Sequence, residues 1–356
     1  MLPASIAVAA FLVAALLIAV HPRGLDEGLA ACALAVIDLV GGAVSPVAGA
    51  AALRDTLPVL VFFAVLLGGV ALLARTKLLG GVVSRLASLA GGDPVRLLAL
   101  VLGLAALVSV VGTNDATALI LPVAVGPLIL LNRLPPAPYI LGMAFVANSA
   151  SVVLPSSNPA TLLALVHLHV SPLAAAPALA LAGLLATGAT IGAVVLLSRR
   201  PLRGAVLARI VTAEDAPLRG GAPWSLLALV AGFTILVTGL EETGVTASLA
   251  GAVRGVSAPL AGVAASIAAN LLNNLPTAIA VGSVVPHTLG FELAVIVGAD
   301  LGPNLTPLGS LSNLLILAAA RRAGIEVSWR QFVLWGLLLG PLTVAAGLGA
   351  VRAVAG

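Results

Sequence analysis

Charged residues are scarce in this chain, and their scarcity limits the class of protein it can be. Only 8% of the 356 residues are Asp, Glu, Lys or Arg, whereas 61% are hydrophobic, and the mean hydropathy is +1.20. Soluble domains carry about a quarter charged residues. The composition therefore excludes an ordinary soluble domain and predicts an all-α polytopic protein of the cell membrane.

Cysteine and the common catalytic motifs are also missing or nearly so. Cys32 is the single cysteine, which excludes an intramolecular disulfide and a cluster of thiolate metal ligands. The sequence has no P-loop, no H-E-x-x-H motif, no glycine-rich nucleotide-binding motif and no nucleophile–base pair. We therefore expect neither an enzyme nor a cofactor or metal site, and energy must come from an ion gradient or a separate subunit.

Long apolar runs are abundant. A run of about 17–25 residues is long enough to cross the bilayer as a helix. Uninterrupted runs lie at residues 2–20, 28–44, 57–74, 172–198, 223–240 and 331–351. Residues 139–169 and 290–319 are each interrupted near the middle by proline and polar residues, which predicts broken transmembrane helices. Residues 95–131 and 257–288 have double length and a polar centre, which predicts re-entrant hairpins or, alternatively, pairs of thin crossings.

The two halves of the chain repeat each other. Residues 114–119 align with 274–279, sharing Asn, Thr and Ala, while Asn148 aligns with Asp300 and Pro155 with Pro307. Interrupted helices at matching positions are typical of secondary transporters built from repeats. We predict N-terminal scaffold helices at 1–44, a first repeat at 45–198, a cytosolic linker at 199–222 and a second repeat at 223–356.

Basic residues indicate that the repeats are inverted. If the hairpins do not cross the membrane, each repeat crosses three times, so the second must be inverted. Placing 199–222 in the cytosol leaves only Arg54, Arg254 and Arg352 outside, out of 17 Lys and Arg residues. This is the asymmetry of the positive-inside rule, so the basic balance reflects orientation rather than nucleic-acid binding.

The polar breaks are the candidate transport site. Asp115 and Asp300 are the carboxylates placed there, and each costs about 2.5–3.5 kcal/mol at the centre of a membrane helix. Such a group can bind a cation when ionised or carry a proton when neutral, which is what ion coupling requires. Alternatively, one or both cap the N-terminus of a half-helix.

Neutral polar side chains at the same breaks are candidate substrate ligands, with interhelical hydrogen bonding as the alternative. They are Thr113, Asn114, Thr117, Asn148, Ser151, Ser156, Ser157, Asn158, Asn273, Asn274, Thr277, Asn304, Thr306 and Ser310. Outside this set, we expect Asp38 to have a structural role or to serve as a relay. We expect His167 to lie at the outer interface and Glu241 to be solvated.

Residues 300–311 (DLGPNLTPLGSL), 273–277 (NNLPT) and 114–121 (NDATALIL) resemble the arsenite/antimonite efflux permeases of the ArsB type, within the ion transporter superfamily. The resemblance extends over nearly the whole chain, including residues 21–25 (HPRGL) and Trp224. It implies an elevator-type fold with scaffold and transport domains that extrudes arsenite or antimonite in exchange for protons. The sequence departs from the family at Asn148, where an aspartate is expected, and at Asn304, where a lysine is expected.

Two other transport functions remain open on the same fold, a sodium-coupled symporter of dicarboxylate-like anions and a sodium/proton antiporter. The expected partners are the lipid bilayer, a small inorganic solute and a coupling ion, H⁺ in preference to Na⁺. The resemblance adds an accessory arsenical-pump ATPase on the cytosolic side, and a homodimer is a further candidate assembly.

Overall fold

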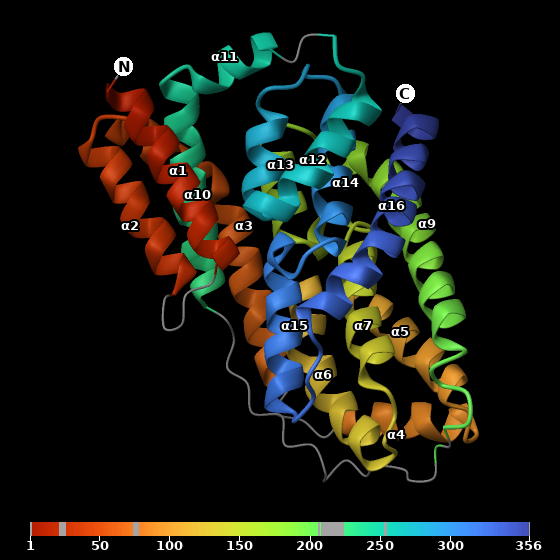
Figure 1. Cartoon of the computed structure of the whole chain (residues 1–356). Coiled ribbons are helices and arrows are strands. Elements are labelled where there is room, and N and C mark those ends of the chain that lie inside the picture. The colour runs from red at the N-terminus through yellow and green to blue at the C-terminus, as the bar shows by residue number, and fades with distance from the viewer. Residues whose placement is uncertain are drawn as a thin grey trace.

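The computed structural model describes residues 2–20, 26–73, 78–205, 207, 224–252 and 255–355, and within these ranges the regular structure is helical throughout. Figure 1 shows the helices in a single elongated molecule. In chain order they are α1 (Leu2–Val20), α2 (Glu27–Val40), α3 (Pro46–Leu73), α4 (Leu78–Ala90), α5 (Pro94–Val111), α6 (Asn114–Leu131), α7 (Pro136–Ala150), η1 (Pro155–Ser157), α8 (Pro159–His167), α9 (Pro172–Ser198), α10 (Ser225–Glu242), α11 (Val245–Ala252), α12 (Ala258–Leu272), α13 (Asn274–Gly282), α14 (Leu289–Leu301), η2 (Gly302–Asn304), η3 (Pro307–Gly309), α15 (Leu311–Arg322) and α16 (Trp329–Ala355).

The predicted all-α membrane fold is confirmed. Among the described residues, α5, α6, α9 and α16 are long and apolar enough to cross a membrane, and several shorter apolar helices accompany them. One expected run has a different boundary, because α3 begins at Pro46 rather than near residue 57, as proline at the first helical position permits. Arg54, predicted in an outer loop, therefore lies within α3. The 21–25 motif and almost all of the linker after residue 205 lie outside the described residues.

The chain passes through the same series of elements twice. A long helix is followed by a short arm (α4 or α11), a helical hairpin (α5–α6 or α12–α13), a broken helix (α7–α8 or α14–α15) and a final long helix (α9 or α16). In Figure 1 the first hairpin lies in the lower half of the molecule and the second in the upper half. The hairpins thus approach the centre from opposite ends, as inverted repeats require.

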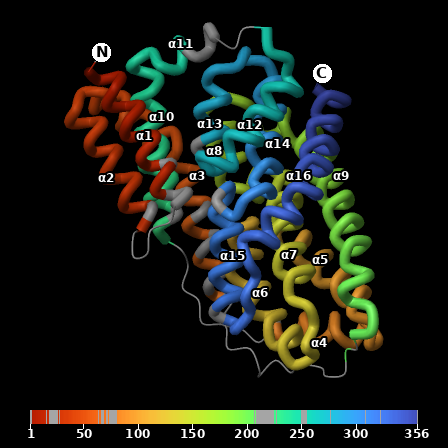
Figure 2. Tube along the Cα trace, in the orientation of Figure 1, coloured from red at the N-terminus to blue at the C-terminus, as the bar shows by residue number. Residues whose placement is uncertain are grey.

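The repeats are interlocked by reciprocal packing. Each hairpin packs its first helix on the broken helix of its own repeat, α5 on α7 and α12 on α14. Its second helix packs on the broken helix of the other repeat, α6 on α15 and α13 on α8, and both pairs are visible in Figure 2. The last helices, α9 and α16, pack on each other, while α1 and α2 pack with α10 beside this core.

The breaks in both long helices fall at proline. Pro155 opens η1 and Pro307 opens η3, each a single turn between two α-helices. Because proline donates no N–H, it cannot continue the α-helical hydrogen bonds of the preceding turn. The tight turn therefore separates α7 from α8 and α14 from α15, at the positions aligned in the two repeats.

A close contact between backbones fixes the helix that carries Asp300. A Cβ atom at Gly298 of α14 would overlap the carbonyl oxygen of Gly262 in α12, and one at Gly262 would lie 2.7 Å from the carbonyl oxygen of Ala294. Small residues allow such close approach between helices in membranes. Gly298 is one turn before the break, so this contact sets the depth at which α14 ends.

We predict that Gly298→Ala lowers the thermal stability of the purified protein, because overpacking a tight contact costs about 1–3 kcal/mol and this neighbour is backbone. Gly349→Ala is the matched control, since a Cβ atom at Gly349, also inside a helix, would meet nothing within 4 Å. Melting curves in detergent measure both variants. Equal melting temperatures for the two would show that α12 and α14 separate without cost.

Candidate functional site

The four polar breaks place the starts of four helices inside the molecule. Thr113 caps α6 by accepting a hydrogen bond from the backbone N–H of Ala116 at 3.0 Å. Asn158 caps α8 through the N–H of Ala160 at 3.0 Å, and Asn273 caps α13 with a backbone φ of 77°. Ser310 stands at the start of α15. These four capping positions are buried, so the partial positive charge of each helix N-terminus acts away from bulk water.

Asp300 ends α14 and accepts hydrogen bonds from the other repeat and from the second hairpin. Asn158 Nδ2 donates to Asp300 Oδ1 at 3.0 Å, and the Thr161 hydroxyl donates to Oδ2. The side chain of Asn274, at the start of α13, also bonds to this carboxylate. Asp300 is only 1% exposed. Asp300 is thus a buried carboxylate whose two oxygens both accept hydrogen bonds, beside the N-termini of α8 and α13.

Asn148 occupies the equivalent position at the end of α7. Its Nδ2 donates to Asn304 Oδ1 and to Asn313 Oδ1, both at 3.0 Å, and its Oδ1 accepts from the Ser312 hydroxyl at 3.0 Å. Asn114, at the start of α6, donates to Ser312 Oγ at 3.3 Å. This cluster is the counterpart of the Asp300 cluster, with an amide in place of the carboxylate.

The two clusters are in contact. Ser151 Oγ donates to the carbonyl oxygen of Asn148 at 3.0 Å and accepts from Asn158 Nδ2 at 3.5 Å. Hydrogen bonds therefore run from Asp300 through Asn158 and Ser151 to Asn148. A change of protonation at Asp300 can reach the Asn148 cluster through this chain of polar groups.

Three polar groups near the clusters have no partner among the described residues. The carboxylate of Asp115, in the first turn of α6, is 4% exposed and receives no hydrogen bond or ion pair from them. Asn304 Nδ2 and Thr277 Oγ1 are fully buried and equally unpaired. Leaving a buried polar group unpaired costs about 1–3 kcal/mol. Unpaired buried groups of this kind have free capacity to bind a solute or an ion.

Other predicted ligands use their hydroxyl groups to support the backbone. Ser157 donates to the carbonyl of Val110 at 2.6 Å, and Thr306 to that of Asn270 at 3.2 Å. Thr117 bonds to Ser109 Oγ at 2.7 Å, which pins α6 to α5. Ser156 is half-buried in η1. Contact of these four with a substrate stays a prediction, and the structure gives Ser157, Thr306 and Thr117 a role in holding the breaks.

Three residues of the clusters are not among the ligands predicted from the sequence. Thr161, Ser312 and Asn313 lie within the first turn of α8 or α15, just after the breaks that drew attention. Thr161 and Asn313 are repeat-related, each three residues after the N-cap position of its helix. A polar residue one turn into the half-helix, matched in both repeats, was the available signal.

Two peripheral acids lie in defined surroundings. Glu241, expected to be solvated, is exposed, and it also accepts a hydrogen bond from Ser283 at 3.0 Å and lies 2.8 Å from Nε2 of His167. These side chains join the end of α10 to the ends of α8 and α13. Asp38 is fully buried in α2, both its oxygens lack a described partner, and Oδ2 lies 2.8 Å from where a Cβ of Gly239 would be. Any side chain larger than hydrogen at 239 would displace this carboxylate.

The clusters around Asp300 and Asn148 combine amides, hydroxyls and a carboxylate, and none of their described members is basic. Among the described residues no group of three His, Cys, Asp or Glu side chains could hold a metal ion. The arrangement suits a small solute with several hydroxyl groups, because amides and hydroxyls donate and accept equally well.

Comparisons with known proteins place the chain among transporters. The citrate transporter family (CitMHS) matches residues 1–292. The arsenical pump membrane proteins of Yersinia enterocolitica and Escherichia coli K12 are each 27% identical over 135 residues, covering 33% of this chain and 31% of the relative. An uncharacterised transporter of Mycobacterium tuberculosis is 32% identical over 139 residues, covering 34% of this chain and 32% of that protein. The aligned part thus spans about a third of each relative's length.

The hydrogen bonds predict different changes in stability when the amide of Asn148 and the acid of Asp300 are exchanged for each other. Asn148→Asp should destabilise the protein, because its new carboxylate would face Asn313 Oδ1, and Asn313 cannot turn without losing its bonds to Pro303 and Thr306. Asp300→Asn should retain near-native stability, since the Thr161 hydroxyl can rotate to accept. Melting temperatures of the two variants test this, and a larger loss for Asp300→Asn would contradict the assignment of donors and acceptors.

Proposed function

The chain belongs to the citrate transporter family and is a membrane transporter, and from this premise we propose that it exports arsenite or antimonite in exchange for protons. The observation that carries the proposal is the neutral polar lining of the two clusters, with two nearby carboxylates and no basic member among the described residues. Arsenite is a weak acid, largely uncharged at neutral pH, with hydroxyl groups that amides and hydroxyls can bind. The names of the arsenical pump relatives support the same substrate.

Proton coupling is assigned to Asp300, with Asp115 as the second carboxylate. In its ionised form Asp300 accepts bonds from Asn158, Thr161 and Asn274. A proton on either oxygen would compete with one of these donors, and the Asn158 or Thr161 side chain would have to reorient. Protonation would in this way change the Asn158 amide that adjoins Ser151 and Asn148, which couples the charge of the acid to the shape of the substrate clusters.

The second candidate is transport of citrate or a similar carboxylate, and the family match favours it. A free citrate anion would place negative charge beside Asp300 and Asp115, which is costly in a buried site. A complex of citrate with a divalent cation would carry less charge, and the unpaired Asp115 carboxylate would attract the cation. Sodium in place of protons would use the same acids.

The protein is proposed to reside in the cell membrane with the 199–222 linker in the cytosol. We propose that the protein consists of a scaffold (α1–α3 and α10) and a moving domain of hairpins and broken helices. This division agrees with the packing of α1 and α2 with α10 beside the core. An accessory ATPase would meet the cytosolic end, and homodimerisation through the scaffold is a further proposal.

Proteoliposomes with an imposed pH gradient test the substrate and the driving ion together. We expect radiolabelled arsenite to accumulate on the acidic side, with no accumulation of citrate in the presence or absence of Mg²⁺ and no stimulation by a sodium gradient. Gradient-driven uptake of citrate without arsenite transport by folded protein would favour the second candidate and refute the first.

Asp300→Asn should abolish proton-driven accumulation of arsenite while retaining exchange of labelled for unlabelled arsenite at equal pH. Exchange at equal pH requires binding and movement but no net proton transfer. Asp55→Asn is the control, because Asp55 is an exposed carboxylate on α3. If Asp300→Asn accumulated arsenite like the control, Asp300 would be a structural acceptor only.

A further inference from the structure

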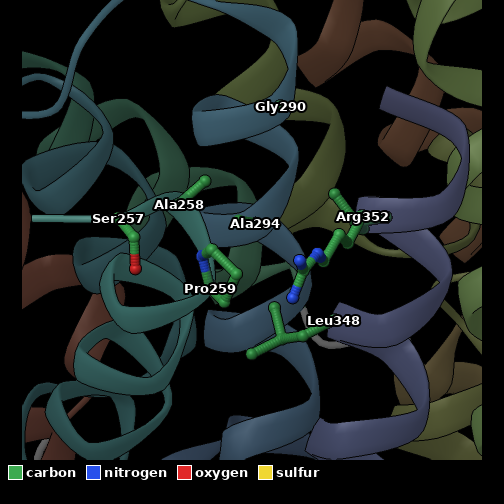
Figure 3. Close-up of a pocket in the computed structure, with 8 residues that line it drawn as sticks. Ser257, Ala258, Pro259, Gly290, Ala294, Leu348 and Arg352 are labelled. Carbon is green, nitrogen blue, oxygen red and sulfur yellow. The ribbon is translucent and has the colours of Figure 1, made fainter. Parts of the chain in front are cut away.

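A groove lies on the side of the molecule, away from the polar breaks. The start of α12, the face of α14 and the last turns of α16 enclose a cavity of about 420 Å³. In Figure 3 the Arg352 side chain extends from α16 across α14 toward Pro259 at the start of α12. Ser257 and Arg352 are exposed, so the groove opens at the end of the molecule where both α12 begins and α16 ends.

The walls of the groove are apolar and its floor is formed by small residues. Leu348 and Val351 of α16 form one wall, and Gly290 and Ala294 of α14 also line the groove. At its end α14 and α16 approach each other closely, since a Cβ at Gly290 would lie 2.7 Å from the carbonyl oxygen of Ala355. In a protein that spans a membrane, an apolar groove on the lateral surface faces hydrocarbon, and an acyl chain fits its chemistry.

The open end of the groove is basic. Arg352 is the charged residue among the described residues that line it, and no described carboxylate pairs with it. The nearest acid in the sequence of α14, Glu292, is 5% exposed, lies 3.4 Å from His287 and does not line the groove. The Ser257 hydroxyl makes no capping bond to α12. The mouth of the apolar groove thus carries an exposed guanidinium and an exposed hydroxyl, and no described carboxylate pairs with the guanidinium.

Arg352 is also an exception to the charge pattern of the sequence. It lies near the C-terminus, at the end of the molecule opposite the one where α9 ends (Figure 1), and the distribution of basic residues in the sequence predicts that this end is the outer one. The positive-inside bias disfavours a basic residue on that side, so its position calls for a local reason. Basic residues near a bilayer surface attract anionic lipid headgroups.

We propose that this groove binds an anionic phospholipid of the outer leaflet, with its phosphate at Arg352 and Ser257 and an acyl chain along Leu348 and Val351. A single unpaired positive charge at the mouth favours a lipid with net negative charge, because the ammonium of a zwitterionic headgroup would be repelled. The lipid would connect α12, α14 and α16, three helices of the second repeat, and would stabilise the unit that carries Asp300.

Binding can be measured on the purified full-length protein in detergent by native mass spectrometry and by melting temperature, with added phosphatidylglycerol or phosphatidylcholine. We expect phosphatidylglycerol to bind and raise the melting temperature more than phosphatidylcholine. Arg352→Gln should weaken its apparent affinity about fivefold, the effect of removing one basic residue at a membrane surface. Arg54→Gln, which removes another exposed arginine outside the groove, should leave the affinity unchanged.

A second variant tests the apolar part independently of charge. Ala258→Phe, at the edge of the groove, should reduce phosphatidylglycerol binding although Arg352 is intact. This variant keeps the proposal testable if Arg352→Gln fails to fold. Equal effects of the two lipids, or unchanged affinity in both groove variants, would overturn the proposal. Conversion of a dimer to a monomer by Arg352→Gln without a change in lipid binding would also overturn it, because the groove would then be an interface with a second copy.

Discussion

Two broken helices and two hairpins with polar tips are stable in a membrane only if their unpaired peptide groups find partners inside the protein. The arrangement of the candidate site follows from how that requirement is met. The breaks are gathered at the centre, where Thr113, Asn158 and Asn273 cap helices and Asn270 and Asn313 bond to the backbone of the 302–310 break. The residues that satisfy the backbone are the same residues that surround the candidate site, so site and fold cannot be separated.

Reciprocal packing explains why each cluster contains residues of both repeats. The acid or amide comes from the end of one broken helix, and its partners come from the half-helix of the other repeat and from the tip of a hairpin. The two repeats differ at this position both in charge and in hydrogen bonding. Asp300 accepts bonds from its neighbours, whereas Asn148 both donates and accepts. A second difference lies at the hairpin tips, where Asp115 of the first repeat aligns with Leu275 of the second.

The sequence was sufficient to predict the helical class, the positions of the breaks and the pairing of Asn148 with Asp300, because proline and buried polar residues leave few alternatives in an apolar chain. It could not supply the partners across the repeats. Thr161 and Ser312 are ordinary helix residues until α8 and α15 are packed against the opposite broken helix. Nor could it separate a ligand from a support, since whether Ser157 reaches a solute or Val110 depends on where η1 lies. The contact of Glu241 with His167 likewise required the ends of α8 and α10 to be brought together.

The inequality of Asn148 and Asp300 has a further consequence for the equilibrium between conformations. If the repeats had identical side chains, exchanging their roles would convert an inward-open state into an outward-open state of the same free energy. A residue that differs between the repeats interacts differently with its neighbours in the two states, and the two states then differ in free energy. In the proposed proton-coupled cycle, the relative populations of the two states in the empty protein would therefore be set by the asymmetric residues. A proton gained or lost by Asp300 would then change the bias between the two states.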